Sequence, residues 1–180
     1  EAGAHGWTVV MGDVCGKGPD AAAVTALARY TLRAAAMREG PPSRSLRLLN
    51  DALLRQRDDR RFCTVAYVYL EPSHGGARVS CAIGGHPLPL LLRSDGNVEA
   101  VGAPGTLVGV LPDPKFEDHS VWLDPGDALL LYTDGVIEGR VGETLDEDRL
   151  AQLLTAYAGA GADAIAAGVE DVALNASGGT

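Results

Sequence analysis

The apolar positions of this chain follow two different periods, and the change between them separates helical from β-rich blocks. Residues 7–12 form a short run rich in β-branched side chains, which predicts a buried strand. Gly18-Pro19 then starts an alanine-rich segment that continues to Met37, and proline at a first helical position favours a helix there. After Gly40-Pro41-Pro42 we expect a second helix, with Ser43 as its N-cap.

Both expected helices carry apolar side chains at helical spacing. The apolar face of the first comprises Val24, Leu27, Leu32 and Met37, and that of the second comprises Leu46, Leu49, Leu53 and Leu54. We expect each face to be the side of the helix that packs into a core.

From Phe62 the pattern changes to short apolar runs separated by turn residues. The expected strands are residues 62–70, 77–83, 88–93, 98–101, 116–123 and 127–132. Glycine-containing turns between successive runs predict antiparallel hairpins. A capping box at Thr144-Leu-Asp-Glu147 predicts a helix to about Tyr157, and a last helix is expected over residues 163–172. Hairpins and helices in separate blocks indicate an α+β layered domain rather than a doubly wound parallel sheet.

Composition narrows the functional classes. The chain has 180 residues, 46% of them hydrophobic, and a formal net charge of −9, which argues against a nucleic-acid partner. No apolar run reaches the roughly 20 residues of a membrane-spanning helix. The three cysteines are odd in number and widely spaced, which fits reduced thiols. We therefore expect a single domain over residues 1–180, cytoplasmic and without membrane contact from this segment.

Two carboxylates are the first candidates for chemistry. Asp13 follows the apolar run 7–12, and Asp134 follows the apolar strand expected at 127–132. A carboxylate at a buried strand end is costly unless its charge is compensated. If folding brings the two together, a cation between them relieves their repulsion, and oxygen ligands select magnesium, manganese or calcium. Each such turn taken alone is weak evidence, and a plain strand-turn-helix connection is the alternative for residues 12–18.

The loop at residues 12–18 also raises a nucleotide-binding alternative. A phosphate-binding loop needs four residues between its first glycine and the Gly-Lys pair, but only three separate Gly12 from Gly16. Gly18 stands where that loop has serine or threonine, and no G-x-G-x-x-G pattern fits. A nucleotide-binding enzyme therefore stays a minor alternative, which predicts ATP binding by this loop.

Four segments resemble, in order, motifs of the sporulation-stage-II-E-type phosphatases, which are bacterial members of the metal-dependent (PPM, or protein phosphatase 2C-like) serine/threonine phosphatases. Gly12-Asp13-Val14-Cys15-Gly16-Lys17-Gly18 is similar to that family's Gly-Asp-Val-Ser-Gly-Lys-Gly. The other three segments are Arg61-Phe62-Cys63-Thr64-Val65, Gly84-Gly85-His86-Pro87-Leu88-Pro89-Leu90, and Pro125-Gly126-Asp127 through Tyr132-Thr133-Asp134-Gly135-Val136. Together they span residues 9–140.

The resemblance implies an α-β-β-α sandwich of two mainly antiparallel sheets flanked by helices, with a two-metal Mn²⁺ or Mg²⁺ centre. Asp13 corresponds to the carboxylate that bridges both metals, Val14 to a backbone carbonyl ligand, and Asp134 to another metal-binding aspartate. Asp13 and Asp134 are then the catalytic pair, and a metal-activated water attacks phosphorus directly. Lys17 and His86 are candidates for substrate binding; a solvated turn lysine and a loop histidine bonded to backbone are the alternatives.

The resemblance also implies partners. The substrate class is phosphoserine or phosphothreonine on an anti-sigma-factor antagonist, and a sensor domain such as PAS or GAF often precedes the phosphatase. The family's early Gly-Asp-Phe-Tyr-Asp motif and its late aspartate pair are not found in these 180 residues. We therefore expect a weakened or incomplete metal site in this segment. A catalytically inactive regulatory binding module with the phosphatase fold stays the alternative.

Overall fold

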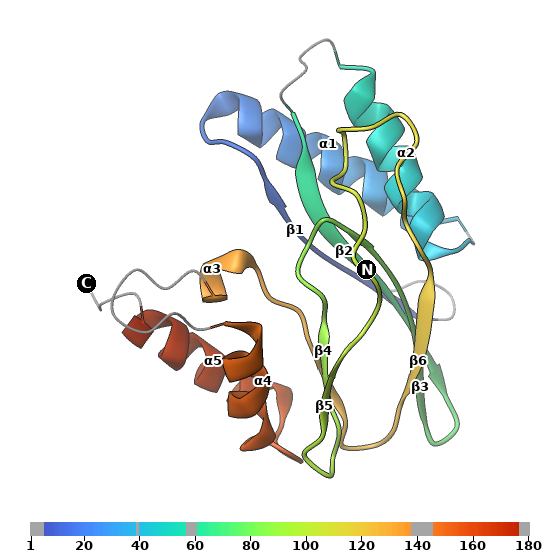
Figure 1. The fold of residues 1–180 in the computed structure, drawn as a ribbon. Helices are drawn as coiled ribbons and strands as arrows, with labels where there is room; N and C mark the ends of the chain where they lie inside the picture. The colour runs from blue at the N-terminus through green and yellow to red at the C-terminus, as the bar shows by residue number, and fades with distance from the viewer. Residues whose placement is uncertain (1–5, 39, 57–60, 138–145, 177–180) are drawn as a thin grey trace. The chain divides into compact units, whose positions relative to one another are not determined.

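A computed structural model describes residues 6–38, 40–56, 61–137 and 146–176 of the chain (Figure 1). Its contacts divide the chain into two compact units, and each is described by itself. Unit 1 comprises Glu1–Leu88 and Gly102–Trp122, and unit 2 comprises Pro89–Val101 and Leu123–Thr180.

Unit 1 is a four-stranded sheet with two helices packed on it. The strands, in spatial order, are β1 (Trp7–Val14), β2 (Cys63–Ser73), β3 (Gly76–Gly84) and β6 (His119–Leu123). β2 pairs antiparallel with both β1 and β3. The helices α1 (Pro19–Ala36) and α2 (Pro42–Leu54) contact each other, and both contact this sheet (Figure 1). The expected hairpin around residues 73–76 is confirmed.

The core of unit 1 confirms most of the predicted helix faces. Its buried residues include Val24, Leu32, Leu46, Leu49 and Leu53, which pack against Cys63, Val65 and Tyr67 of β2. Met37 and Leu54 were wrongly included in those faces, because their exposed fractions are 81% and 38%. Met37 is the C-cap residue after α1 has ended. Leu54 follows Leu53 directly, and a step of one residue rotates a side chain by about 100° around the helix axis.

The start of α2 differs from the expectation. Ser43 is not the N-cap, because the helix begins at Pro42 and Pro41 holds the cap position. Instead, the Ser43 N–H and Oγ–H donate to the two carboxylate oxygens of Asp118 at 2.8 and 2.6 Å. A carboxylate from the segment before β6 therefore satisfies the first turn of α2, where the helix dipole favours negative charge.

β1 is an edge strand, and the expectation that it is buried was wrong. The exposed fractions of Trp7, Val9 and Val10 are 50%, 43% and 41%. β1 is the terminal strand of the sheet order and pairs with β2. An apolar run cannot by itself distinguish a covered strand from an edge strand, since both use β-branched side chains.

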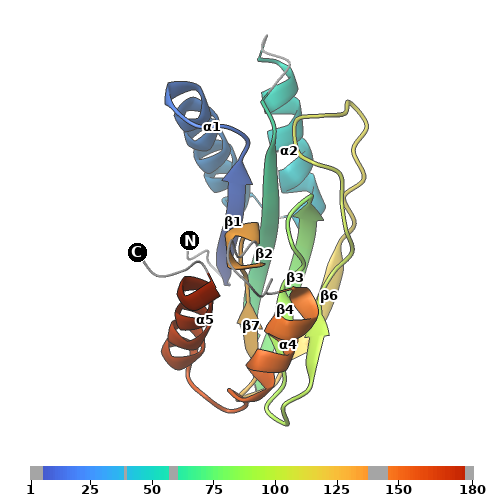
Figure 2. The same cartoon turned by 60° about the vertical axis from the view of Figure 1, so that its left-hand side comes forward.

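Unit 2 is a three-stranded sheet with helices packed on it (Figure 2). The strands, in spatial order, are β5 (Val98–Ala100), β4 (Leu90–Leu92) and β7 (Ala128–Leu130), with both pairs antiparallel. The helices are α3 (Asp134–Ile137), α4 (Glu147–Thr155) and α5 (Ala162–Ala176). α4 contacts β4 and β5, and α5 contacts α3 and α4. Two antiparallel sheets with helices on them confirm the expected α+β class.

The N-terminus of α4 lies within the stretch that the capping box predicts. Asp146 is the N-cap, and its side chain accepts a hydrogen bond from the Arg149 N–H at 2.8 Å. Thr144, the expected cap, lies outside the described residues. None of the helices in the described ranges combines the length and the apolar character needed to cross a bilayer.

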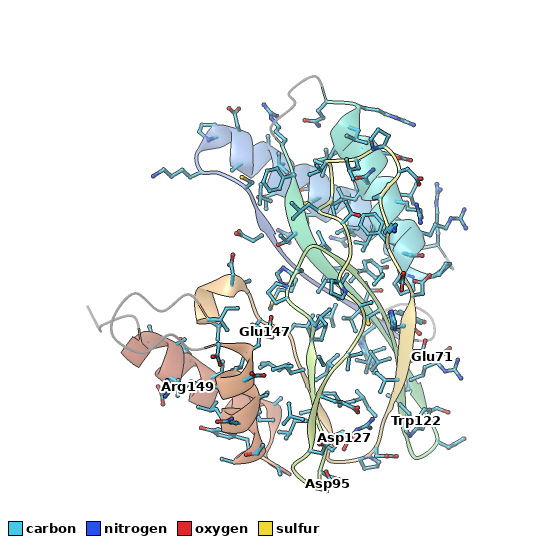
Figure 3. The ribbon with its side chains drawn as sticks, in the orientation of Figure 1. Glu71, Asp95, Trp122, Asp127, Glu147 and Arg149 are labelled. Atoms are coloured by element: carbon cyan, nitrogen blue, oxygen red, sulfur yellow. The ribbon has the colours of Figure 1, made fainter. Side chains whose placement is uncertain are left out.

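A buried carboxylate ties together the turns at one end of unit 2. The side chain of Asp127 is 2% exposed and receives hydrogen bonds from the N–H groups of Ser94 and Asp124 and from Arg93 Nη1 at 2.9 Å (Figure 3). Burial of this carboxylate raises its pKa, but the hydrogen bonds and the Arg93 charge outweigh that effect and hold the pKa of Asp127 below its ordinary value. The Pro-Gly-Asp turn is therefore a structural anchor.

This depressed pKa predicts a stability contribution that acid removes. Because folded Asp127 binds its proton less readily than the unfolded side chain, its contribution is fully present above about pH 4 and is lost as the pH falls through the folded pKa. Asp127→Asn should lower the free energy of unfolding by about 2 kcal/mol at neutral pH. Urea unfolding of the full chain from pH 7 to 3 measures this difference, with exposed Asp171→Asn as the control. A difference that does not shrink below pH 4 contradicts the assignment.

Candidate functional site

Asp13 lies at the end of β1 with its carboxylate open to solvent. The β1–β2 register places it opposite Thr64, and its N–H donates to Thr64 Oγ1 at 3.2 Å. One carboxylate oxygen, Oδ1, accepts from the Val14 N–H at 2.9 Å. Asp13 is exposed, so the expected cost of burying this carboxylate is not incurred. Two hydrogen bonds thus hold the residue while its charge faces water.

The glycine before Asp13 is required by the close approach of the two strands. A Cβ atom at Gly12 would collide with the carbonyl oxygen of Thr64. That oxygen belongs to the backbone and cannot move aside as a flexible side chain can. Gly12 therefore lets β1 approach β2 closely enough for the Asp13 N–H to reach the Thr64 hydroxyl.

A pocket of about 610 Å³ opens beside Asp13, within unit 1 and between β1, β2 and α1. Asp13 and Thr64 line one part of it, and Leu32 is among its apolar lining. Arg29 and Arg33 contribute from α1, and their spacing of four residues places them on one face of the helix. The lining of this pocket therefore includes two positively charged side chains as well as Asp13.

The loop that leads from β1 to α1 contains the other residues of the first motif. Lys17 is exposed there, which leaves the substrate-binding role and the solvated alternative both standing as predictions. Cys15 is exposed and free. Burial raises the pKa of the Cys63 thiol to about 12, and burial together with the Asp118 charge raises that of Cys81 to about 11. The two buried thiols stay protonated at neutral pH and supply no thiolate nucleophile.

His86 is buried and connected to the Asp13 end of β1. It is 6% exposed, and its Nδ1 lies 2.9 Å from Thr64 Oγ1. Thr64 therefore contacts both the backbone of Asp13 and the ring of His86. The sequence analysis did not single out Thr64, although it lies in the second family-like motif; a hydroxyl among the apolar residues at the start of β2 is the signal that could have drawn attention to it.

Asp134 belongs to unit 2 and starts a helix, whereas the sequence placed it at a strand end. β7 ends at Leu130, and Asp134 is the exposed first residue of the four-residue helix α3. Nearby Tyr132 is buried; burial first, and then the carboxylate of Glu147, raise the pKa of its phenol to about 12. Glu147 is labelled in Figure 3. A strand that ends at an aspartate and a helix that begins at one both show apolar residues followed by an acidic residue. The sequence alone therefore could not tell that Asp134 starts a helix.

The oxygen donors available fit a hard divalent cation. Asp13 and Asp134 offer carboxylates and Val14 a carbonyl, which suit Mg²⁺ or Mn²⁺ better than zinc or copper. In the part of the chain that the structure describes, no group of three or more His, Cys, Asp or Glu side chains gathers as a metal site. Asp13 lies in unit 1 and Asp134 in unit 2, so their joint binding of a metal stays a prediction.

Comparison with known proteins decides the family. The profile described as Stage II sporulation protein E (SpoIIE) matches residues 3–179. This chain belongs to the SpoIIE family. Among its relatives, phosphoserine phosphatase RsbP of Bacillus subtilis is 29% identical over 139 residues, which cover 74% of this chain and 34% of RsbP. The chain spans about a third of the length of the curated relatives it matches.

Solved structures agree with the SpoIIE assignment. The RsbU and RsbW domains of Rv1364c from Mycobacterium tuberculosis match with a TM-score of 0.78 and 28% identity, over 95% of this chain and 48% of that one. The PP2C phosphatase domain of SpoIIE from Bacillus subtilis, solved with a fragment of its regulatory domain, matches with a TM-score of 0.76 and 19% identity, over 100% of this chain and 52% of that one. The second likeness shows that this SpoIIE-family chain has the PP2C fold.

Proposed function

We propose that this SpoIIE-family protein is a divalent-metal-dependent protein phosphatase that hydrolyses phosphoserine or phosphothreonine on an anti-sigma-factor antagonist in the cytoplasm. The family match over residues 3–179 and the similarity to a named phosphoserine phosphatase support the reaction class. The similarity to a structure that contains RsbU and RsbW domains supports the partner class. A sensor domain such as PAS or GAF in the same protein is part of the proposal.

One observation carries this proposal: the exposed carboxylate of Asp13 stands at the family's metal-ligand position, and residue 13 is among those that line the pocket. Asp13 is held by hydrogen bonds through its N–H and its Oδ1, so it is oriented before any ligand arrives. Asp13, Asp134 and the Val14 carbonyl are the proposed ligands of Mn²⁺ or Mg²⁺. A bound divalent ion supplies a water of lowered pKa and neutralises charge that develops on the phosphoryl group. The pocket beside Asp13 then receives the substrate side chain.

The direct experiment is phosphate release by the full-length protein. We expect release from a phosphoserine-bearing anti-sigma-factor antagonist with Mn²⁺ or Mg²⁺, loss of release in EDTA, and recovery when Mn²⁺ is added back. An unphosphorylated antagonist is the blank. No release with any divalent cation, together with tight binding of the phosphorylated antagonist, contradicts the phosphatase and supports the binding module.

The binding module remains a second candidate because of one structural observation. The described ranges gather no cluster of three metal-ligating side chains, and Asp13 and Asp134 lie in different units, so a phosphatase fold that docks partners without turnover stays open as the alternative. Isothermal titration of Mn²⁺ into the full chain separates the two candidates. The enzyme predicts saturable binding, whereas the module predicts none.

The arginines of the pocket predict a preference for large acidic substrates. If the phosphoprotein enters beside Asp13, Arg29→Glu should raise its KM about tenfold with little change in kcat, since one reversed charge weakens encounter and docking. The KM for p-nitrophenyl phosphate should stay nearly constant, because this substrate is too small to contact Asp13 and Arg29 together. Arg38→Glu is the matched control, because Arg38 follows α1 outside the pocket lining. Equal effects of the two variants contradict entry through this pocket.

A further inference from the structure

We propose that His86 is a positioning residue for Asp13, acting through the hydroxyl of Thr64. This inference rests on the proposed function only for its consequence in metal binding; the contact itself is a property of unit 1. It assigns His86 a role different from direct substrate contact. It also gives Thr64, which lies between the two, a specific task.

Three segments distant in sequence meet at this point. Residue 13 is next to the last residue of β1, residue 64 is the second residue of β2, and residue 86 follows β3. The antiparallel register places Asp13 opposite Thr64, and a parallel bridge joins Val65 to Gly85. The bridge brings Gly85 beside Val65, and a hydrogen bond joins the two neighbouring side chains, His86 Nδ1 and Thr64 Oγ1. His86 therefore meets Thr64 where the chain has left β3, next to the start of β2.

The path of the chain into His86 depends on Gly85. This residue has φ of +67°, and a Cβ atom there would lie 2.5 Å from the Leu107 side chain and 3.1 Å from the Leu107 Cα. Only glycine combines that backbone conformation with so close a neighbour. The constraint turns His86 inward, where it is 6% exposed, instead of leaving it on a solvent loop.

The hydrogen bonds form a connected path. A threonine hydroxyl has one proton and two lone pairs. Thr64 Oγ1 can therefore accept from the Asp13 N–H at 3.2 Å and still pair with His86 Nδ1 at 2.9 Å, whichever ring tautomer is present. His86 restricts the Thr64 rotamer, and that rotamer decides whether the Asp13 amide has its acceptor.

This path of hydrogen bonds ends at Asp13 in β1, which is an edge strand. β1 has its ladder with β2, and Asp13 is next to its last residue, where strand ends fray most readily. Residues that hydrogen-bond to a metal ligand without touching the metal commonly contribute about 10–100-fold to metal affinity. We therefore expect the Thr64–His86 pair to hold Asp13 in a metal-competent position.

The first test needs no metal. In the metal-free full chain, Thr64→Val keeps the side-chain shape and removes the hydroxyl, whereas Thr64→Ser keeps it. Amide hydrogen exchange at Asp13, followed by NMR, should accelerate about tenfold in Thr64→Val and stay near wild type in Thr64→Ser. His86→Asn, which retains a polar atom near the Nδ1 position, should lie closer to wild type than His86→Leu. Unchanged exchange at Asp13 in Thr64→Val overturns the inference.

The second test measures Mn²⁺ affinity by the EPR signal of the free ion. The Mn²⁺ dissociation constant should rise about tenfold in Thr64→Val and recover in Thr64→Ser. Wild-type affinity in Thr64→Val overturns the positioning role and leaves the proposed function standing. No Mn²⁺ binding by the wild type overturns the proposed function, and the exchange experiment still decides the positioning role. Thr64 is only half-buried, so its variants should fold even if a His86 variant does not.

Discussion

Asp13→Asn is expected to lower kcat/KM for the phosphoprotein about 1000-fold, which corresponds to about 4 kcal/mol of lost transition-state stabilisation. Asparagine is nearly isosteric, and its side-chain oxygen can still accept from the Val14 N–H. The substitution therefore removes the charge and leaves the end of β1 in place. Loss of a carboxylate ligand weakens metal binding and with it the charge neutralisation on which phosphoryl transfer depends. Steady-state kinetics over a range of Mn²⁺ concentrations measure the effect.

Asp20→Asn is the matched control for this experiment. Asp20 lies in the first turn of α1, and its side chain is 82% exposed, so the substitution makes the same charge change close to the same loop. Its ion pair with Arg61, at 3.4 Å, is largely solvated and contributes little. Comparable losses in both variants indicate a general electrostatic effect, and a wild-type rate in Asp13→Asn removes Asp13 from the metal site.

Asn50→Leu is expected to produce the largest loss of stability among the polar substitutions considered. Asn50 is fully buried in α2, where its Nδ2 donates to the Leu111 carbonyl at 3.0 Å and its Oδ1 accepts from the Gly109 N–H at 2.8 Å. Leucine fills a similar volume but leaves both backbone groups without this partner. Each backbone group that loses its partner in these partly buried contacts costs about 1–3 kcal/mol, so the free energy of unfolding should fall by about 3 kcal/mol.

Asp51→Leu introduces the same side chain at the exposed neighbouring position and should change stability by less than about 0.5 kcal/mol. Urea unfolding of the full chain followed by circular dichroism measures both variants. A loss in Asn50→Leu no larger than in Asp51→Leu contradicts the anchoring role. Because Asn50 holds the 109–111 segment, its substitution should also disturb the neighbouring bridge between Cys63 and Val108.

Sequence predicted the parts of this fold that depend on local patterns. The leucines at 46, 49 and 53 recur at helical spacing and are buried, with exposed fractions of 0%, 0% and 2%. The turn at 73–76 joins two strands that the alternation of residues had already suggested. Such signals lie within one element, so the chain's own periodicity is sufficient to reveal them.

The features that sequence missed depend on contacts between distant segments. The carboxylate that caps α2 comes from residue 118, and the partners of Asn50 lie near residue 110. β1 has the composition of a buried strand, yet its place at the edge of the sheet follows from strand order. The Thr64–His86 contact likewise joins two segments that are distant in the sequence. No local pattern encodes these pairings.

For the candidate site, the motifs located Asp13, Val14 and Asp134, and the structure supplies the surroundings of each. Two features were found only in the structure: the Thr64 hydroxyl that accepts from the Asp13 N–H, and the arginines in the pocket lining. The pairing of Asp13 with Asp134 is the step on which the proposed metal chemistry depends.

Anomalous diffraction at the manganese absorption edge, from crystals of the full chain soaked in Mn²⁺, tests that pairing most directly. We predict an anomalous peak within coordination distance of carboxylate oxygens from both Asp13 and Asp134. A manganese peak that contacts neither carboxylate, or a fully soaked crystal without a peak at either one, would contradict the account.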